Sequence, residues 1–171
     1  MRIKEVIYLG FSIFICLGAG MIGSIYTSSS IDTWYATLEK PTFNPPSWLF
    51  APVWTTLYFL MGISLFLISR HGLRKGGIKL AISIFGLQLV LNALWSFIFF
   101  GMQNPFLAFM EIIVLWIAIL ITIMAFYKIK KVASVLLVPY IIWVTIATIL
   151  NYYIWRLNIW SGNRYSFLIN I

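Results

Sequence analysis

The sequence predicts an all-α protein, an integral membrane bundle of five transmembrane helices that forms a single domain over residues 1–171. Of its residues, 62% are hydrophobic and only 9% are charged, whereas a soluble domain carries about 25% charged residues. So few polar side chains cannot cover a surface that faces water, which excludes a soluble globule, a disordered chain and a small disulfide-stabilised secreted protein. Five apolar runs have about the 20-residue length that a helix needs to cross the hydrocarbon core, and none alternates like a membrane β-barrel strand.

The five predicted spans follow one another with short connections, apart from one long loop. They cover about residues 6–26, 48–68, 80–100, 106–127 and 132–154, and the second begins at either Trp48 or Val53. The long loop, residues 27–52, contains Pro41, Pro45, Pro46 and Pro52. Because proline fixes the backbone and lacks a donor, we expect this loop to be ordered, with Pro52 near the first turn of the second helix.

The fourth span contains Glu111, the only acidic residue inside a predicted span. A carboxylate in the hydrocarbon region is unfavourable, and for that reason it is a candidate functional group. Because Glu111 lies near the start of its span, the alternative is that it reaches the interface or pairs with a neighbouring group.

Lysine and arginine are distributed unevenly between the two ends of the predicted bundle. We call the end that carries the long loop the loop end and the opposite end the basic end. The basic end carries Arg2, Lys4, Arg70, Arg74, Lys75, Lys79, Lys128, Lys130 and Lys131, and the loop end carries Lys40, Arg156 and Arg164. Because basic residues are retained on the cytoplasmic side, we expect a cytoplasmic N-terminus and an outside C-terminus if the host is a plasma membrane. The net charge of +8 is thus a topology signal, and we expect no nucleic-acid partner.

Cysteine and histidine occur once each, as Cys16 and His71. A single cysteine cannot form an intrachain disulfide, and these two residues cannot build a protein metal site of the usual kinds. We therefore expect no metal site, no required cofactor and no Ser-His-Asp catalytic set.

The eight tryptophans are concentrated towards the loop end. Six map to this end or its half of the bilayer, namely Trp34, Trp48, Trp54, Trp95, Trp155 and Trp160, while Trp116 and Trp143 fall near the middle. Interface anchors would be shared between both ends of a bundle. The skew therefore favours an aromatic-lined cavity that opens towards the loop end, with anchors and core packing as the alternative.

Helical spacing gathers aromatic, amide and small side chains on single faces of three spans. These faces carry Trp54, Tyr58 and Met61 in the second span, Gln88, Asn92, Trp95 and Phe99 in the third, and Tyr140, Trp143, Ala147 and Leu150 in the fifth. Ala147 is the small member of its face and leaves room for a flat ligand. Amides in a membrane helix need partners, so Gln88 and Asn92 either bond neighbouring helices or, for Asn92, orient a ligand.

Other polar and small residues also have two possible roles. Lys40 and Arg156 either pair with carboxylates of an amphipathic ligand at the cavity mouth or extend to lipid headgroups. The first span carries two pairs of small residues spaced four apart, Ala19 with Gly23 and Gly20 with Ser24. Such pairs pack against a neighbouring helix of the same chain or form a dimer contact.

Four blocks of residues, in order along nearly the whole chain, carry a specific resemblance. They are Trp34-Tyr35, Leu38, Lys40-Pro41, Phe43 and Pro45-Pro46; Trp54 and Tyr58; Asn92-Ala93-Leu94-Trp95-Ser96; and Pro139-Tyr140, Trp143, Ala147, Leu150-Asn151, Trp155 and Asn158. In these blocks the sequence closely resembles the TspO/MBR family, whose members are also called tryptophan-rich sensory proteins, translocator proteins or peripheral-type benzodiazepine receptors. The tail after Asn158 is longer than we expect for a compact bacterial member.

The resemblance implies a five-helix membrane protein that is usually a homodimer and that binds tetrapyrroles such as protoporphyrin IX and haem, and isoquinoline carboxamides. It also implies sterol binding in animal members and light-driven oxidative breakdown of protoporphyrin IX in some bacterial ones. Carried over residue by residue, the ligand-binding positions are Tyr35, Pro45, Trp54, Asn92, Trp95, Trp143, Ala147 and Leu150. Trp54 and Trp143 match the tryptophans linked to porphyrin breakdown.

The leading hypothesis is a tetrapyrrole-binding receptor or transport-type membrane protein, with Lys40 and Arg156 meeting the two porphyrin carboxylates. Because the loop end has no histidine, we expect metal-free porphyrin to bind at least as well as haem. The alternatives are an enzyme that degrades protoporphyrin through Trp54 or Trp143, a sterol- or lipid-binding protein, and a stress-sensing regulator that acts through partner proteins. The sterol alternative rests on residues 150–156, which fit a weak sterol-contact pattern.

Overall fold

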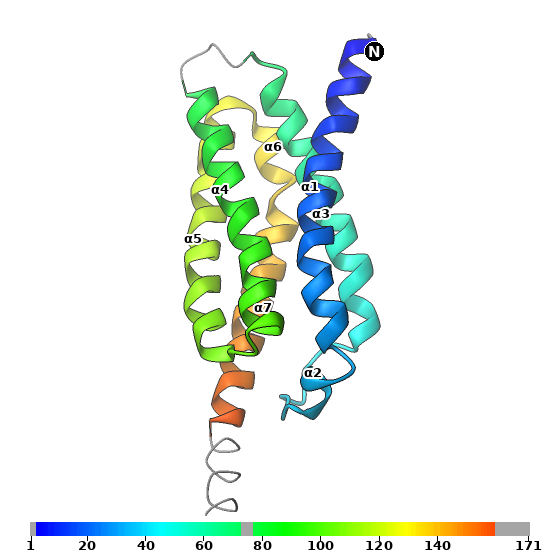
Figure 1. Cartoon of the computed structure of the whole chain (residues 1–171). Helices are drawn as coiled ribbons and strands as arrows, with labels where there is room; N and C mark the ends of the chain where they lie inside the picture. The colour runs from blue at the N-terminus through cyan, green and yellow to red at the C-terminus, as the bar shows by residue number, and fades with distance from the viewer. Residues whose placement is uncertain (1–2, 73–76, 160–171) are drawn as a thin grey trace, which may run out of the picture.

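The computed structural model describes residues 3–72 and 77–159, and these residues form helices joined by short connections, with no strand among them (Figure 1). Five helical stretches are long and apolar enough to cross a membrane: Ile3–Ser30, Ser47–Ser69, Ile78–Gly101, Pro105–Ile129 and Lys131–Asn158. The predicted fold class is therefore confirmed. Arg2, Arg74, Lys75, Trp160, Arg164 and the tail beyond residue 159 lie outside the described residues.

The helices follow the predicted order, with extra short elements at their ends. They are α1 (Ile3–Ser30), α2 (Trp34–Thr37), the 3-10 turn η1 (Ser47–Leu49), α3 (Phe50–Ser69), α4 (Ile78–Ser96), the π-helical turn η2 (Phe97–Gly101), α5 (Pro105–Ile129), α6 (Lys131–Val135) and α7 (Val138–Asn158). The start of α5 has clear local causes. The Asn104 side chain accepts a hydrogen bond from the Leu107 N–H at 3.0 Å, and Pro105 stands where a missing N–H is harmless.

The first helix continues beyond the predicted span, through a serine-rich segment that was expected to belong to the loop. Ser24, Ser28 and Ser29 donate their hydroxyls to the carbonyls of Met21, Ile25 and Tyr26 in the preceding turn. These bonds satisfy the hydroxyls within the helix, so the segment is compatible with a helical conformation. Pro41, Pro45 and Pro46 thus lie between α2 and the η1–α3 stretch rather than directly after the first span, and Pro52 lies in the first turn of α3, as predicted.

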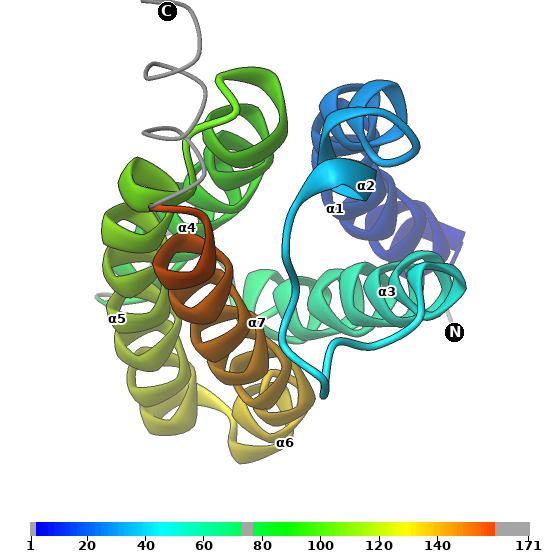
Figure 2. The same cartoon turned by 90° about the horizontal axis from the view of Figure 1, so that it is seen from below.

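Packing leaves the bundle tight at the basic end and more open at the loop end. α1 packs along α3 and α4, α4 packs on α5, and α5 packs on α7. α3 meets the last span mainly through α6, at the basic end, and hardly through α7. Seen from the loop end, the segment between α2 and α3 crosses the bundle between α7 and α1 (Figure 2).

Small residues of α1 and α3 allow the close approach of these helices. A Cβ on Gly62 would lie 2.6 Å from the Ile13 Cα, and a Cβ on Gly23 would lie 3.1 Å from the Ser96 Oγ on α4. Gly20 faces the Tyr58 ring in the same way. The small residues Gly20 and Gly23 therefore pack within the chain, which is the first of the two roles expected for them.

Replacing Gly62 with alanine should destabilise the contact between α1 and α3. The new methyl group meets backbone rather than a movable side chain, so the helices must separate, at a cost of about 1–3 kcal/mol. Thermal unfolding in detergent should show a lower Tm for Gly62→Ala. Gly10→Ala on α1 is the matched control, because its Cβ would meet nothing within 4 Å; equal Tm values for the two variants would contradict the packing argument.

Candidate functional site

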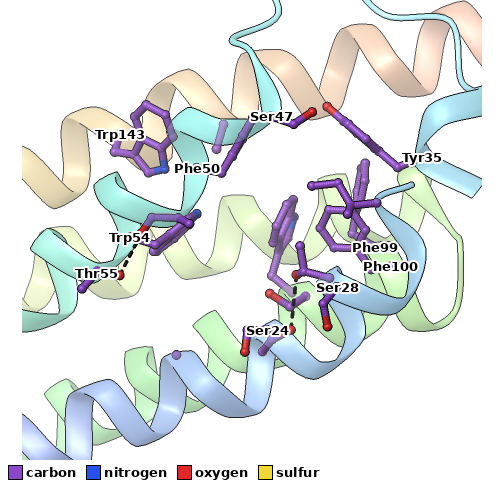
Figure 3. A pocket seen from close by; sticks show the side chains of 18 of the residues that line it. Ser24, Ser28, Tyr35, Ser47, Phe50, Trp54, Thr55, Phe99, Phe100 and Trp143 are labelled. Atoms are coloured by element: carbon purple, nitrogen blue, oxygen red, sulfur yellow. Dashed lines mark hydrogen bonds between the residues drawn. The ribbon is translucent and has the colours of Figure 1, made fainter. Parts of the chain in front are cut away.

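A cavity of about 540 Å³ lies in the loop half of the bundle, between α1, α3, α4 and α7 and beneath the α2 segment. Trp54 on α3 and Trp143 on α7 border one side of it, and Tyr35 and Phe99 border the other (Figure 3). The part of the wall formed by α1 includes the small residues Gly20, Gly23, Ser24 and Ser28, which leave space on that side. Its size is within the range of small-molecule sites, about 300–1,000 Å³.

Aromatic pairs hold the flat side chains of the wall in place. Trp54 stacks on Tyr58 with ring centroids 5.6 Å apart, and Trp95 stacks on Phe99 at 5.1 Å. Two consecutive phenylalanines of η2, Phe99 and Phe100, both face the cavity, and η2 is a π-helical turn of the kind that often marks functional sites. The Ser30 hydroxyl donates to the Phe100 carbonyl at 3.0 Å, which fixes this turn to the end of α1.

The indole nitrogens of Trp95 and Trp143 have different surroundings. Trp95 Nε1 donates to Asn151 Oδ1 at 3.0 Å, and Asn151 Nδ2 donates to the Pro105 carbonyl at 2.7 Å. Trp95 is therefore tied to α7 and, through Asn151, to α5. Trp143 Nε1 is buried, and within the described part of the chain it has no hydrogen-bond partner. Its ring is positioned by packing, including an edge contact with Phe50 at 5.8 Å.

A chain of buried hydrogen bonds lies behind the cavity wall and connects α3, α4 and α7. The Tyr58 hydroxyl donates to Asn92 Oδ1, Asn92 Nδ2 donates to the Tyr140 hydroxyl at 2.9 Å, and this hydroxyl donates to Gln88 Oε1 at 3.0 Å. Tyr58 belongs to the wall, whereas Asn92, Tyr140 and Gln88 do not. Asn92 and Gln88 thus bond neighbouring helices, which is the first of the two roles expected for these amides.

Glu111 does not pair with a described group, contrary to one of the expectations for it. Its side chain is buried, and among residues 3–72 and 77–159 neither carboxyl oxygen has a hydrogen-bond partner. That it reaches the membrane interface stays a prediction.

The loop after α2 is ordered over the cavity by its own polar contacts, as its prolines predict. The buried Tyr35 donates its hydroxyl to Asn44 Oδ1 at 3.1 Å, and burial raises the pKa of this phenol. Lys40 Nζ lies 4.7 Å from the centre of the Tyr35 ring and donates to the carbonyl of Leu38 at 3.1 Å. Desolvation lowers the pKa of the Lys40 ammonium.

A side-chain clasp holds this loop to the end of α7. Asn158 Nδ2 donates to the Glu39 carbonyl at 2.9 Å, and the Glu39 N–H donates to Asn158 Oδ1 at 3.1 Å. Phe43 adds an edge contact with Tyr153 at 5.4 Å. The clasp uses only the backbone of Glu39, so it does not depend on the side chain at that position.

Six of the eight predicted ligand-binding residues line this cavity: Tyr35, Trp54, Trp95, Trp143, Ala147 and Leu150. Pro45 and Asn92 lie outside the wall, and so do the carboxylate-pairing candidates Lys40 and Arg156. Arg156 is exposed, with its guanidinium 6.0 Å from the centre of the Trp155 ring. Ligand contact by any of these residues stays a prediction.

Sequence reasoning missed part of the wall. α1 contributes Gly20, Ser24 and Ser28, which are spaced four apart, and η2 and α3 contribute Phe100 and Phe50. The spacing of the three small residues was a usable signal, because residues four apart share one helix face. The tryptophans concentrated towards the loop end do not all line the cavity: Trp48 is 72% exposed and lies outside the wall.

Comparison with known proteins decides the family. The profile of the TspO/MBR family matches residues 12–156, which include every residue that lines the cavity. The chain belongs to the TspO/MBR family. The resemblance carried by the four sequence blocks is thereby confirmed, and this TspO/MBR protein is a membrane protein.

Bacterial, archaeal and human relatives cover most of the chain. It is 43% identical over 155 residues to the tryptophan-rich protein TspO of Chlorobaculum tepidum, a match that covers 91% of this chain and 98% of the relative. It is 47% identical over 148 residues to the protein of the same name from Archaeoglobus fulgidus, covering 86% and 94%. The human translocator protein is 36% identical over 160 residues, covering 91% and 93%.

Replacing Asn158 with alanine should release the loop from α7. Each lost hydrogen bond is worth about 1 kcal/mol, so amide hydrogen exchange at Glu39 and its neighbours should become several-fold faster. Glu39→Gln is the matched control, because it keeps the backbone groups that Asn158 binds, and it should leave exchange unchanged. Equal exchange in Asn158→Ala and the unmodified protein would show that the clasp does not hold the loop.

Proposed function

We propose that this protein is a membrane receptor or transport-type protein that binds a tetrapyrrole, with protoporphyrin IX as the first candidate, in the loop-end cavity. The observation that carries the proposal is the set of three indoles, Trp54, Trp95 and Trp143, around one apolar space of about 540 Å³. Protoporphyrin is a flat apolar disc with two carboxylates at one edge. Aromatic side chains offer such a disc a large contact area and offset stacking.

The polar edge of the porphyrin requires cationic partners near the cavity mouth. Lys40 is half-buried in the loop that lies over the cavity. Its ammonium donates to the carbonyls of Ala36 and Leu38. To meet a carboxylate it exchanges these neutral acceptors for a charged one, which forms a stronger bond. Arg156 is exposed at the same end of α7 and offers the second partner.

Haem has no evident advantage over the metal-free ligand in this proposal. The sole histidine, His71, follows α3 at the basic end, where its Nδ1 lies 2.8 Å from the Leu67 carbonyl. The cavity therefore offers no axial imidazole for iron. Haem should bind no more tightly than protoporphyrin IX.

Titration of the purified protein with protoporphyrin IX, followed by tryptophan fluorescence quenching, tests the binding proposal. Trp143→Phe and Trp54→Phe should each raise the Kd roughly two- to ten-fold, since an aromatic contact contributes about 0.5–1.5 kcal/mol. Trp116→Phe is the control, because Trp116 lies outside the cavity wall and donates to Thr145 Oγ1 at 2.9 Å. Saturable binding that none of the cavity variants changes would place the ligand elsewhere.

A second candidate function is light-driven breakdown of protoporphyrin IX, with dioxygen as the oxidant. It is favoured by the position of two oxidisable indoles, Trp54 and Trp143, directly in the wall of the cavity. A bound porphyrin would touch both rings, so a photochemical oxidant formed there meets them first.

Porphyrin absorbance under illumination and in the dark separates the two functions. An enzyme should destroy several equivalents of protoporphyrin per protein in the light only, and Trp143→Phe should lose this turnover. A binding protein should quench fluorescence in both conditions without consuming the ligand. Dark turnover would contradict the photochemical mechanism.

Sterol binding and stress sensing through partner proteins remain the alternative functions. The sterol alternative concerns residues 150–156, in which Leu150 faces the cavity while Tyr152, Tyr153 and Arg156 are exposed. A regulator would depend on its basic-end loops rather than on the cavity, so its output would survive the loss of porphyrin binding.

A further inference from the structure

A second hollow, of about 630 Å³, lies on the outer face of the bundle between α3 and α7. We call it the α3–α7 groove and define it by Trp48 in η1, Val53 and Leu60 on α3, and Pro139, Ile142 and Trp143 on α7. Trp143 also belongs to the wall of the loop-end cavity. One indole ring therefore separates the groove from the cavity.

The groove matches one leaflet of a bilayer in length. From Trp48 to Leu60 the helix rises about 18 Å at 1.5 Å per residue, and one leaflet is half of a hydrocarbon core about 30 Å thick. Trp48, at the loop end of the groove, is 72% exposed, as expected of a side chain at the membrane interface. The groove thus runs from the interface towards the middle of the membrane.

The lining of the groove is apolar and opens to the lipid-facing surface. Thr56 is the one lining residue with a hydroxyl, and this hydroxyl donates to the Pro52 carbonyl at 2.8 Å. Ile142 is 56% exposed. The groove exists because α3 packs against α1 and α6 and hardly against α7.

An empty groove of this kind is unfavourable in a membrane. Water is absent from the hydrocarbon region, and side chains that border a void lose their dispersion contacts. A hydrocarbon chain restores these contacts and requires no hydrogen bonds. The occupant that fits the length, the lining and the position is a single lipid chain.

We propose that the α3–α7 groove is a binding site for one acyl chain of a phospholipid from the leaflet at the loop end, and that this chain packs against the face of Trp143 opposite the cavity. Trp143 Nε1 has no hydrogen-bond partner in the described residues, so packing neighbours rather than a hydrogen bond position this ring. The ring is then held between Phe50 on the protein side and lipid on the other. The lipid site does not depend on the proposed tetrapyrrole binding.

Photochemical labelling in nanodiscs tests the proposal without any porphyrin. The protein is reconstituted with phosphatidylcholine that carries a diazirine in the inner half of one acyl chain, irradiated, and mapped by mass spectrometry. We expect labels to concentrate on the groove residues, including Trp143. Ile142→Trp fills the groove from its exposed side and should reduce this labelling several-fold.

Ile149→Trp is the matched control. Ile149 is 47% exposed on the same helix and does not line the groove, and residues seven apart share a helix face. It should leave groove labelling unchanged. If Ile142→Trp fails to fold, Val53→Phe narrows the groove from α3 and must give the same loss. Labels spread evenly over lipid-facing residues, or groove labelling that survives the filling variant, would overturn the proposal.

Discussion

The hydrogen-bond chain Tyr58–Asn92–Tyr140–Gln88 is the interaction on which the architecture depends. Lipid offers no partner for a buried amide or hydroxyl, so these groups bond one another. By doing so they tie α3, α4 and α7 together at one level of the bundle. Gln88 Nε2 alone among the polar atoms of this hydrogen-bond chain has no partner in the described residues. Towards the loop end no comparable chain joins α3 to α7 among the described residues, and these helices hardly pack there. The cavity begins where this restraint ends, with Tyr58 as the residue common to both.

In this arrangement the hydrogen-bonded amides lie behind the cavity wall, and mainly apolar side chains line the cavity. The amide oxygens of Asn92 and Gln88 accept hydrogen bonds behind the wall, and several hydroxyls that border the cavity donate to carbonyls of their own helices, as Ser24 and Thr55 do. The wall therefore presents mainly apolar side chains, among them several ring faces, and such a wall suits recognition by shape and flatness rather than by hydrogen bonds. The buried Trp143 Nε1 has no hydrogen-bond partner among the described residues, so this donor is free for a further group.

The sequence predicts the fold well because the length of each apolar run can be read directly along the chain. Five runs that are long enough to cross the membrane specify five spans. It also identifies much of the wall, because residues three, four and seven apart on one helix face must reach the same neighbour, as Trp143, Ala147 and Leu150 do. Periodicity does not say which helix that neighbour is. Asn92 has the same periodicity as Trp95, yet it contacts Tyr58 and Tyr140 instead of the cavity. Lys40 likewise lies outside the wall, because nearby loop carbonyls compete for its ammonium.

The last helix connects these features. α7 contributes Trp143, Ala147 and Leu150 to the wall. It also positions the Trp95 ring through Asn151 and binds the loop after α2 through Asn158. It contacts α3 directly where the Phe50 and Trp143 rings meet, whereas the last span packs on α3 mainly through α6 at the basic end. A tetrapyrrole bound in the cavity, as proposed, would contact α7 on one side, and an acyl chain in the α3–α7 groove would contact the same helix from outside. Because both would press on the Trp143 indole, occupancy of either space would change the packing energy available to the other, and lipid composition would then affect ligand affinity.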